Sequence, residues 1–154
     1  MVEVEKVEIK DYQKLEVLIE SHSVSKLGFH IVWCTKYRHP ALTGNAGIEV
    51  KKVIAETCRE YGWACRSIEV MPDHVHLFIQ IHPTERLTDV VRTLKSISAV
   101  AIFCKFPDLK ANKFWGSGLW SKSTYYGSVG QVSQGVILKY LDNQKKDLKT
   151  VTMN

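Results

Sequence analysis

The stretch 71–81, Met-Pro-Asp-His-Val-His-Leu-Phe-Ile-Gln-Ile, constrains the fold of this chain more than any other segment. After the Met-Pro-Asp lead-in its residues alternate in the manner of a β-strand, so that one face is entirely aliphatic: Val75, Leu77, Ile79 and Ile81. We expect this face to lie in the core. His74 and His76 then share the opposite face, roughly 7 Å apart along the strand, close enough to bind one metal ion. A His-x-His pair alone is about as often part of a solvated surface as part of a metal site, so the distinction depends on the rest of the sequence.

The length and composition of the chain indicate one globular domain. Its 154 residues, 45% hydrophobic and 24% charged, can bury a sizeable core. No apolar run approaches the roughly 20 residues of a membrane span, and the acidic, alternating N-terminus is not a signal peptide. The four cysteines form no Cys-x-x-Cys pair, which argues against a zinc ribbon or a redox motif. We therefore expect a cytoplasmic, nucleoid-associated protein whose cysteines behave as small hydrophobic residues.

Charge is distributed unevenly along the chain. Residues 1–20 contain six of the 16 acidic residues and three of the 21 basic ones, which leaves residues 21–154 with 10 and 18, a net charge of +8. The positive net charge of residues 21–154 favours binding to a polyanion such as nucleic acid, although many ordinary domains are equally basic. Residues 1–20 are interpreted as a short strand and a helical turn. Residues 1–26 then form an N-terminal extension to a domain at 27–154.

The order of the predicted elements indicates an α+β fold. Strands are expected at 27–37, 63–70, 74–81 and 113–120, and helices at 48–61, at 84–107 and at 133–148. Gly62 ends the first helix, Thr84 caps the second, and residues 71–73 turn between two antiparallel strands. This is the split βαβ pattern, a ferredoxin-like (RRM-like) antiparallel sheet with two helices on one face. The other face is open, and a C-terminal helix is added.

The final predicted helix carries a tyrosine and a glutamine one turn apart. Val136, Tyr140 and Gln144 follow at intervals of four and so share one face of the helix. If this helix packs across the open face of the sheet, Gln144 becomes a third metal ligand beside the two histidines. Taken alone, Tyr140 is more often a packing residue with its hydroxyl in water.

Basic residues near the predicted sheet are candidates for contacts with DNA phosphates. Lys36 and Arg38 follow the first predicted strand, and Arg92 and Lys95 lie off the apolar stripe of the second helix. Such clusters are more often solvated ends and faces of elements.

Five motifs occur in order along the chain: Val32-Trp33-Cys34-Thr35-Lys36-Tyr37-Arg38, Met71-Pro72-Asp73-His74-Val75-His76, Leu119-Trp120-Ser121, Gly127-Ser128-Val129-Gly130 and Tyr140-Leu141-Asp142-Asn143-Gln144. Together they resemble the single-tyrosine HUH transposases of bacterial and archaeal insertion sequences. The resemblance covers roughly residues 27–146, and several ordered motifs are far more specific than one. The acidic segment 1–20 departs from the family pattern, as does Tyr125-Tyr126, where an aromatic and an aliphatic residue are more common.

The resemblance implies a nuclease and strand transferase that acts on single-stranded DNA at hairpin-bearing transposon ends. Matched residue by residue, His74, His76 and Gln144 would hold one divalent ion, magnesium or manganese. Tyr140 would attack the phosphodiester and leave a 5′-phosphotyrosine and a free 3′-hydroxyl. Phenol is a poor nucleophile at a pKa near 10, so a metal that polarises the phosphate assists the attack. Family members are homodimers whose tyrosine helix can complete the active site of the partner subunit.

Three other functions stay open at this point. A domesticated relative would nick chromosomal palindromes without moving an element. A non-catalytic protein that binds single strands should carry aromatic residues where His74 and His76 stand. A metal-dependent hydrolase would use water instead of Tyr140. Tyr125 and Tyr126 are alternative nucleophiles, although neither precedes a glutamine at one helical turn.

Overall fold

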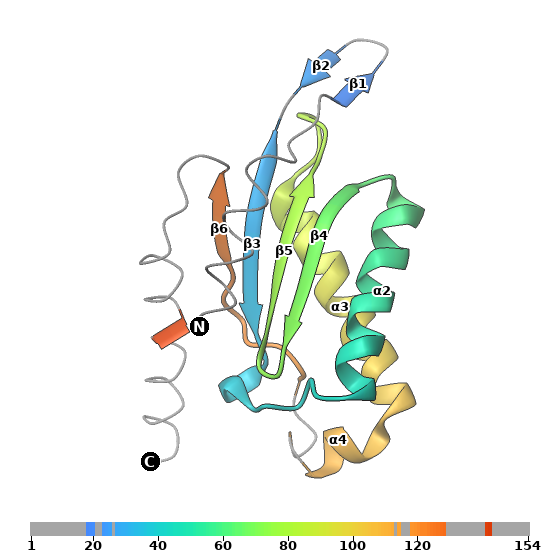
Figure 1. Cartoon of the computed structure of the whole chain (residues 1–154), viewed down its shortest axis with the longest axis vertical. Coiled ribbons are helices and arrows are strands. Elements are labelled where there is room, and N and C mark those ends of the chain that lie inside the picture. Colours follow the sequence, from blue (N-terminus) through green and yellow to red (C-terminus); the bar gives the residue numbers. More distant parts are fainter. Residues whose placement is uncertain are drawn as a thin grey trace.

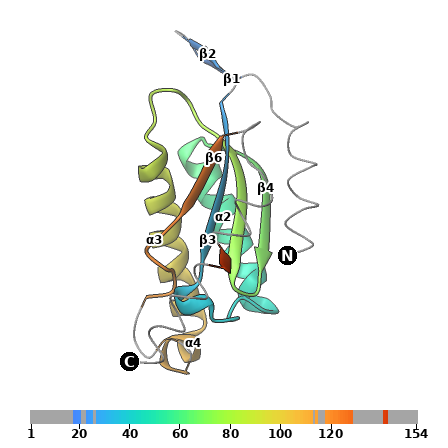
Figure 2. The same cartoon turned by 90° about the vertical axis from the view of Figure 1, so that its left-hand side faces the viewer.

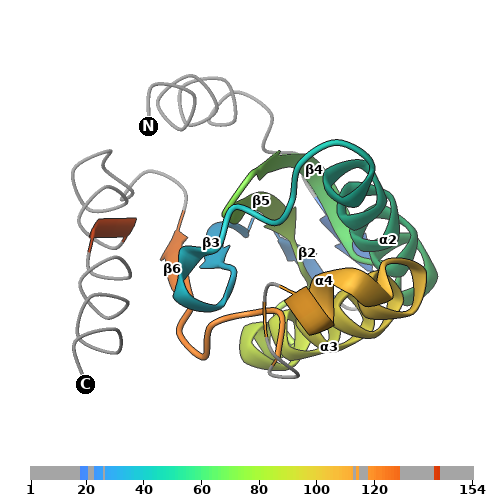
Figure 3. The ribbon, with the colours of Figure 1, turned by 90° about the horizontal axis from the view of Figure 1, so that it is seen from below.

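The computed structural model describes residues 18–20, 23–25, 27–112, 114, 118–128 and 141–142. Its main sheet has four antiparallel strands in the order β4-β5-β3-β6 (Figure 1). These strands are β3 (Gly28–Cys34), β4 (Ala64–Met71), β5 (His74–Gln80) and β6 (Tyr125–Ser128). Helices α2 (Asn45–Tyr61) and α3 (Leu87–Lys105) cover one face of the sheet, and the short α4 (Pro107–Asn112) follows α3 (Figure 3). The predicted α+β class and ferredoxin-like arrangement are confirmed.

The aliphatic face of β5 lies in the core, as predicted. Val75, Leu77 and Ile79 are fully buried and belong to one cluster that also takes side chains from the neighbouring strand and from both helices: Ile31, Trp33, Ile54 and Leu94. Burial of such a side chain contributes roughly 1.5–3 kcal/mol. Because side chains alternate along a strand, this burial also fixes which face carries the two histidines.

Helix α2 and the turn that follows it agree closely with the predicted pattern. The helix begins at Asn45, three residues earlier than predicted, and ends at Tyr61, with Gly62 as its C-cap at a left-handed φ of 74°. Glycine adopts this conformation without steric cost. The backbone amide of Trp63 then bonds the carbonyl of Cys58 at 2.9 Å, which turns the chain into β4.

Two predicted elements have other boundaries. Helix α3 begins at Leu87 with Arg86 as its N-cap, so the expected cap at Thr84 is wrong. The last strand that the structure describes is Tyr125–Ser128 and not 113–120. Among the described residues of 113–120, only Trp120 takes part in pairing, through an isolated bridge to Thr35. Phe114, Leu119 and Trp120 are buried in the core between the sheet and the helices. Their apolar character therefore reflects loop packing, while the sheet edge next to β3 is built by the tyrosine pair.

The first strand is shorter than predicted and ends at Cys34. The 3-10 turn η2 (Lys36–Arg38) follows, and in it Tyr37 and Arg38 have φ values of 60° and 54°. A left-handed backbone costs a non-glycine residue roughly 1–2 kcal/mol. Two such residues in succession mark a place where surrounding contacts hold the backbone in an unfavourable conformation.

The ends of the chain lie largely outside the described residues. Strands β1 (Leu18–Glu20) and β2 (Ser23–Ser25) form a separate antiparallel hairpin beyond the start of β3 (Figure 2). The helical turn expected within residues 1–20 therefore does not extend over residues 18–20, and the rest of it lies outside the described residues. Of the predicted helix at 133–148 only Leu141 and Asp142 are described, and both are helical. Among the described residues, no helix combines the length and apolarity needed to cross a membrane.

Candidate active site

His74 and His76 lie on the face of β5 that points away from α2 and α3. Their cross-strand neighbours on β3 are Cys34 and Val32 respectively. The two histidines are only 4% and 1% exposed, so this face, which helices α2 and α3 leave open as predicted, is covered by other parts of the chain. Leu141 supplies part of the cover, because it is fully buried against Val32 and Cys34. The residue next to Tyr140 in the chain thus packs on the histidine face of the sheet.

An acidic residue in the turn before β5 holds His74. The Nδ1 atom of His74 is 2.8 Å from Asp73 Oδ1, and Arg38 donates from Nε and Nη2 to Asp73 Oδ2 at 3.0 and 2.9 Å. Burial by itself raises the pKa of Asp73, but the hydrogen bond with His74 and the charge of Arg38 outweigh it and lower the pKa. The ionised carboxylate therefore accepts the Nδ1 proton and leaves Nε2 as the free basic nitrogen of His74.

The loop after β3 fastens this turn. The backbone amides of Thr35 and Leu42 donate to the carbonyls of Asp73 and Pro72, each at 2.9 Å. The left-handed backbone at Arg38 turns its side chain inward, where it is 6% exposed. Its Nη1 donates to the carbonyl oxygen of Leu141 at 2.8 Å. Arg38 was predicted as a phosphate contact, and the structure gives its guanidinium these internal partners.

A third histidine, His30 on β3, belongs to the same cluster. Its Nδ1 lies 3.1 Å from His76 Nε2, and its ring stacks on Phe78 with centroids 5.0 Å apart. Burial lowers the pKa of His30 to about 4, and burial together with the neighbouring His30 and His74 lowers the pKa of His76 to about 3. Both rings are therefore neutral at pH 7, the state in which imidazole binds metals.

Sequence reasoning missed His30 and the role of Asp73. The alternation of β3 carries a signal for His30, because Ile31 and Trp33 face the core and so place it on the histidine face. Asp73 adjoins His74 in the sequence, but only the turn brings its carboxylate against the ring. Arg38 could not be linked to Asp73 from the sequence, since 35 positions separate them.

The histidine pair fits a divalent metal ion. Within the described residues, His74 Nε2 and His76 Nδ1 are buried and have no hydrogen-bond partner. Neutral imidazole nitrogens are good ligands for first-row transition metals, and a buried polar atom without a partner is costly. The same part of the chain contains no group of three histidine, cysteine or acidic side chains that could hold a metal. A complete site therefore needs a ligand of another type or from another segment.

The predicted nucleophile and third ligand, Tyr140 and Gln144, lie outside the described residues. Of the alternative tyrosines, Tyr125 pairs with Val32 and shares the histidine face, two strands and roughly 10 Å from β5. Tyr126 must point to the opposite face and lines a cavity beside α3. This position makes Tyr126 unsuitable as a nucleophile at the histidines.

Two of the predicted DNA contacts, Arg92 and Lys95, line this cavity beside α3, whose volume is about 440 Å³. Arg92 is 75% exposed and is 3.3 Å from Asp89. Lys95 donates to the carbonyl of Ser121 at 2.7 Å, and burial lowers its pKa. Lys36, by contrast, is half-buried at the β3 exit, with Nζ 5.6 Å from the centre of the Tyr37 ring.

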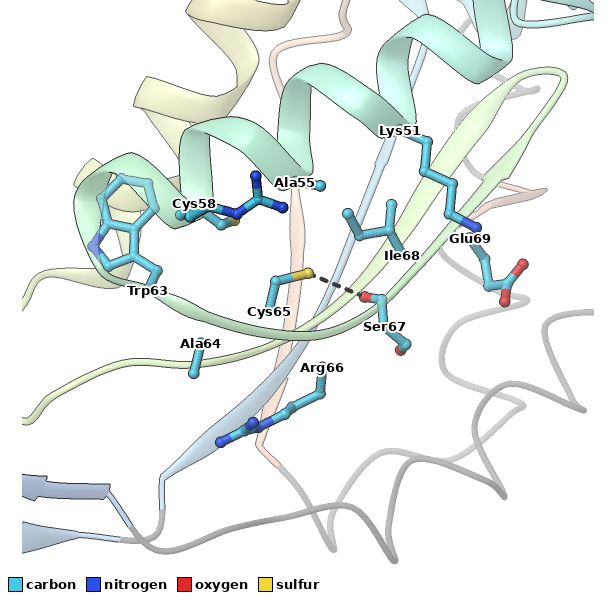
Figure 4. A pocket seen from close by; sticks show the side chains of 11 residues that line it. Lys51, Ala55, Cys58, Trp63, Ala64, Cys65, Arg66, Ser67, Ile68 and Glu69 are labelled. Carbon is cyan, nitrogen blue, oxygen red and sulfur yellow. Dashed lines mark hydrogen bonds between the residues drawn. The ribbon is translucent and has the colours of Figure 1, made fainter.

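A second cavity, of about 590 Å³, lies between α2 and the edge strand β4 (Figure 4). Its lining includes Lys51, Trp63 and Cys65, whose Sγ contacts the carbonyl of Ser67 at 3.7 Å. No histidine is among the residues that line it. The candidate site is therefore the covered face of the sheet and not this cavity.

The chain is similar to known transposases over most of its length. The family model described as "Transposase IS200 like" matches residues 23–144. The ISDra2 transposase TnpA of Deinococcus radiodurans is 36% identical over 121 residues, which cover 79% of this chain and 86% of that protein. The transposase of insertion sequence element IS200 from Salmonella typhimurium is 26% identical over 129 residues, 84% of each chain.

Solved structures agree with these matches. The crystal structure of a Deinococcus radiodurans R1 protein described as a transposase superimposes with a TM-score of 0.74 at 34% identity, covering 82% of this chain and 97% of that one. A REP-associated tyrosine transposase bound to a REP hairpin has a TM-score of 0.52 at 11% identity, with 75% and 63% covered, and shows a likeness of fold alone. The match to the family model and the ISDra2 relative together establish that the chain is a transposase and belongs to the IS200-like transposase family.

Proposed function

We propose that this transposase nicks and rejoins single-stranded DNA at hairpin-bearing transposon ends, through a covalent bond to Tyr140. The observation that carries the proposal is the pair of buried imidazole nitrogens, His74 Nε2 and His76 Nδ1, left without hydrogen-bond partners on the sheet face that Leu141 covers. His74, His76 and Gln144 would hold magnesium or manganese, with the Gln144 amide oxygen as the harder ligand. The bound metal would polarise the scissile phosphate and stabilise the departing oxygen.

The tyrosine accounts for both halves of the reaction. The Tyr140 phenol gives up its proton, and its oxygen attacks the phosphorus while the bond from phosphorus to the 3′-oxygen breaks. One DNA end leaves as a 3′-hydroxyl, and the other stays on the protein as a 5′-phosphotyrosine. A 3′-hydroxyl of another end then attacks the phosphotyrosine and releases Tyr140. The phosphodiester energy is retained in the covalent intermediate, so rejoining needs no ATP.

The first experiment tests the covalent step. Wild type, Tyr140→Phe and Tyr125→Phe are incubated with manganese or magnesium and with labelled single-stranded DNA from the ends of the protein's own element, then run on a denaturing gel. We expect a metal-dependent protein–DNA adduct for wild type and Tyr125→Phe and none for Tyr140→Phe. Cleavage without an adduct, unchanged in Tyr140→Phe, would mean that water attacks. Binding without cleavage would indicate a binding protein.

We further propose that the protein acts as a homodimer in which the tyrosine helix can serve the partner's histidines. The family resemblance supports this arrangement, and the contact of Leu141 with the histidine face of its own chain represents the alternative, in which the helix acts in cis. The test mixes two inactive proteins, His76→Ala and Tyr140→Phe, and lets their subunits exchange. Adduct formation by the mixture requires a tyrosine acting in trans, whereas an inactive mixture with proven exchange would refute it.

DNA backbone contacts are proposed at the cavity between α3 and the segment before β6. Arg92 and Lys122 bring exposed positive charge there, next to the aromatic residues Trp120 and Tyr126. Arg92→Ala should weaken binding of single-stranded DNA equally for all sequences. It should also reduce the slope of log K against log salt by roughly 0.7 for each phosphate that the variant no longer neutralises. An unchanged slope would place the DNA-binding surface elsewhere.

A further inference from the structure

Arg38 connects two parts of the candidate site that are far apart in the chain. On one side of its guanidinium, Nε and Nη2 donate to Asp73 Oδ2, and Asp73 in turn holds His74 through Oδ1. Nη1 donates to the carbonyl oxygen of Leu141, 103 positions away in the sequence. Leu141 is the residue immediately after Tyr140. One planar group therefore contacts both the support of a proposed metal ligand and the peptide next to the proposed nucleophile.

The backbone around Arg38 has an unusual conformation. Tyr37 and Arg38 both adopt left-handed backbone conformations, although neither is a glycine. Such conformations persist only where other contacts determine them, and they concentrate at functional sites. Here they direct the Arg38 side chain into the protein, where it is 6% exposed. A charged group at that depth requires the partners described above.

The chemistry of the side chain matters as much as its charge. Guanidinium presents donors in a rigid fork, so Asp73 and Leu141 can be bonded at the same time in one geometry. A lysine ammonium is a compact charge on a flexible stem and can neutralise Asp73, but it cannot hold two partners on different edges of a plane. The two contacts can therefore be separated by substitution.

We propose that Arg38 is a positioning residue that couples the orientation of the metal ligand His74 to the docking of the segment that carries Tyr140. This inference rests on the proposed function, in which His74 binds the metal and Tyr140 attacks the DNA. Arg38 itself would touch neither the DNA nor the metal. It acts through the carboxylate of Asp73 on one side and through the backbone of Leu141 on the other.

The test compares Arg38→Lys, Asp73→Asn and Arg38→Ala with wild type. Arg59→Gln is the matched control, because Arg59 is an exposed arginine at the end of α2. Three quantities are measured on proteins whose thermal unfolding shows that they are folded. They are the affinity for Mn²⁺ by electron paramagnetic resonance, the hydrogen exchange of the peptide containing Leu141, and the single-turnover rate of adduct formation at saturating Mn²⁺.

The two single-contact variants should behave in opposite ways. Arg38→Lys keeps a positive charge near Asp73, so Mn²⁺ affinity stays within about threefold of wild type. Exchange at Leu141 should accelerate, and the adduct rate should fall, each by roughly tenfold or more, because the variant lacks a hydrogen bond from a charged donor. Asp73→Asn should weaken Mn²⁺ binding by roughly 10–100-fold and leave exchange at Leu141 near the wild-type value. Arg38→Ala should show both defects, and Arg59→Gln neither.

Arg38 is only a structural ion pair if folded Arg38→Ala exchanges at Leu141 and forms the adduct at wild-type rates. The proposal is also overturned if Arg38→Lys and Asp73→Asn show the same pattern of defects. Failure of the proposed function looks different, because wild type itself would then form no adduct. In that case the exchange of the Leu141 peptide still measures whether Arg38 docks this segment.

Discussion

Lowering the pH in the absence of metal should destabilise the protein strongly, because the core of the candidate site contains two neutral histidines. The pKa of His30 is lowered to about 4 and that of His76 to about 3, from an ordinary value of 6.5. Between pH 6.5 and these values the unfolded chain binds the protons and the folded chain does not. The stability from these groups is therefore fully present above pH 6.5 and is lost as the pH falls.

The size of the effect follows from these pKa values. Between pH 7.5 and pH 5.0 each histidine removes roughly 2 kcal/mol from the free energy of unfolding, so the pair removes roughly 4 kcal/mol. Near pH 5 the free energy of unfolding should change by roughly 2–3 kcal/mol for each pH unit. The lowered pKa of Asp73 acts in the same direction, but only at more acidic pH, below the ordinary range of a carboxyl group.

Urea denaturation at several pH values, with a chelator present and unfolding followed by circular dichroism, measures this dependence. His30→Phe is the control, since its ring can keep the stacking on Phe78 while one titrating group is removed. In this variant the free energy of unfolding should depend on pH about half as strongly as in wild type. The variant also loses the hydrogen bond between His30 and His76, which lowers its stability equally at all pH values. If the free energy of unfolding of wild type changes by less than about 1 kcal/mol between pH 7.5 and pH 5.0, the two rings are not buried in the neutral form.

Three further substitutions test the fold that positions the site. Leu77→Ala should cost roughly 2–5 kcal/mol of stability, because Leu77 is fully buried in the face of β5 opposite the histidines. Gly62→Ala should cost about 1 kcal/mol of stability because of the left-handed φ of 74°. No steric clash adds to this cost, since a β-carbon there would meet no atom within 4 Å. An unchanged urea midpoint would contradict the assigned helix end. Trp120→Phe removes the bond from Nε1 to Ser98 Oγ at 3.0 Å and should cost roughly 1–3 kcal/mol, with a double variant carrying Ser98→Ala showing a less than additive effect.

The folding pattern was largely readable from local sequence signals. Alternation in 71–81 determined the core face of β5, and Gly62 determined the end of α2, because both signals act over a few residues. The last strand was assigned incorrectly for the opposite reason. Phe114 and Trp120 are apolar because a loop packs them into the core, and nothing local distinguishes such a loop from a strand.

The candidate site also has features that the sequence determines and features that only the tertiary structure determines. The sequence alone determined that His74 and His76 share one face, since a two-residue spacing on a strand requires it. Only the tertiary structure decided that this face is covered, that His30 bonds His76, and that Arg38 reaches both Asp73 and Leu141. Those contacts join residues 35 to 103 positions apart. They depend on how strands pair and how a strained turn directs one side chain, and a local pattern does not encode either.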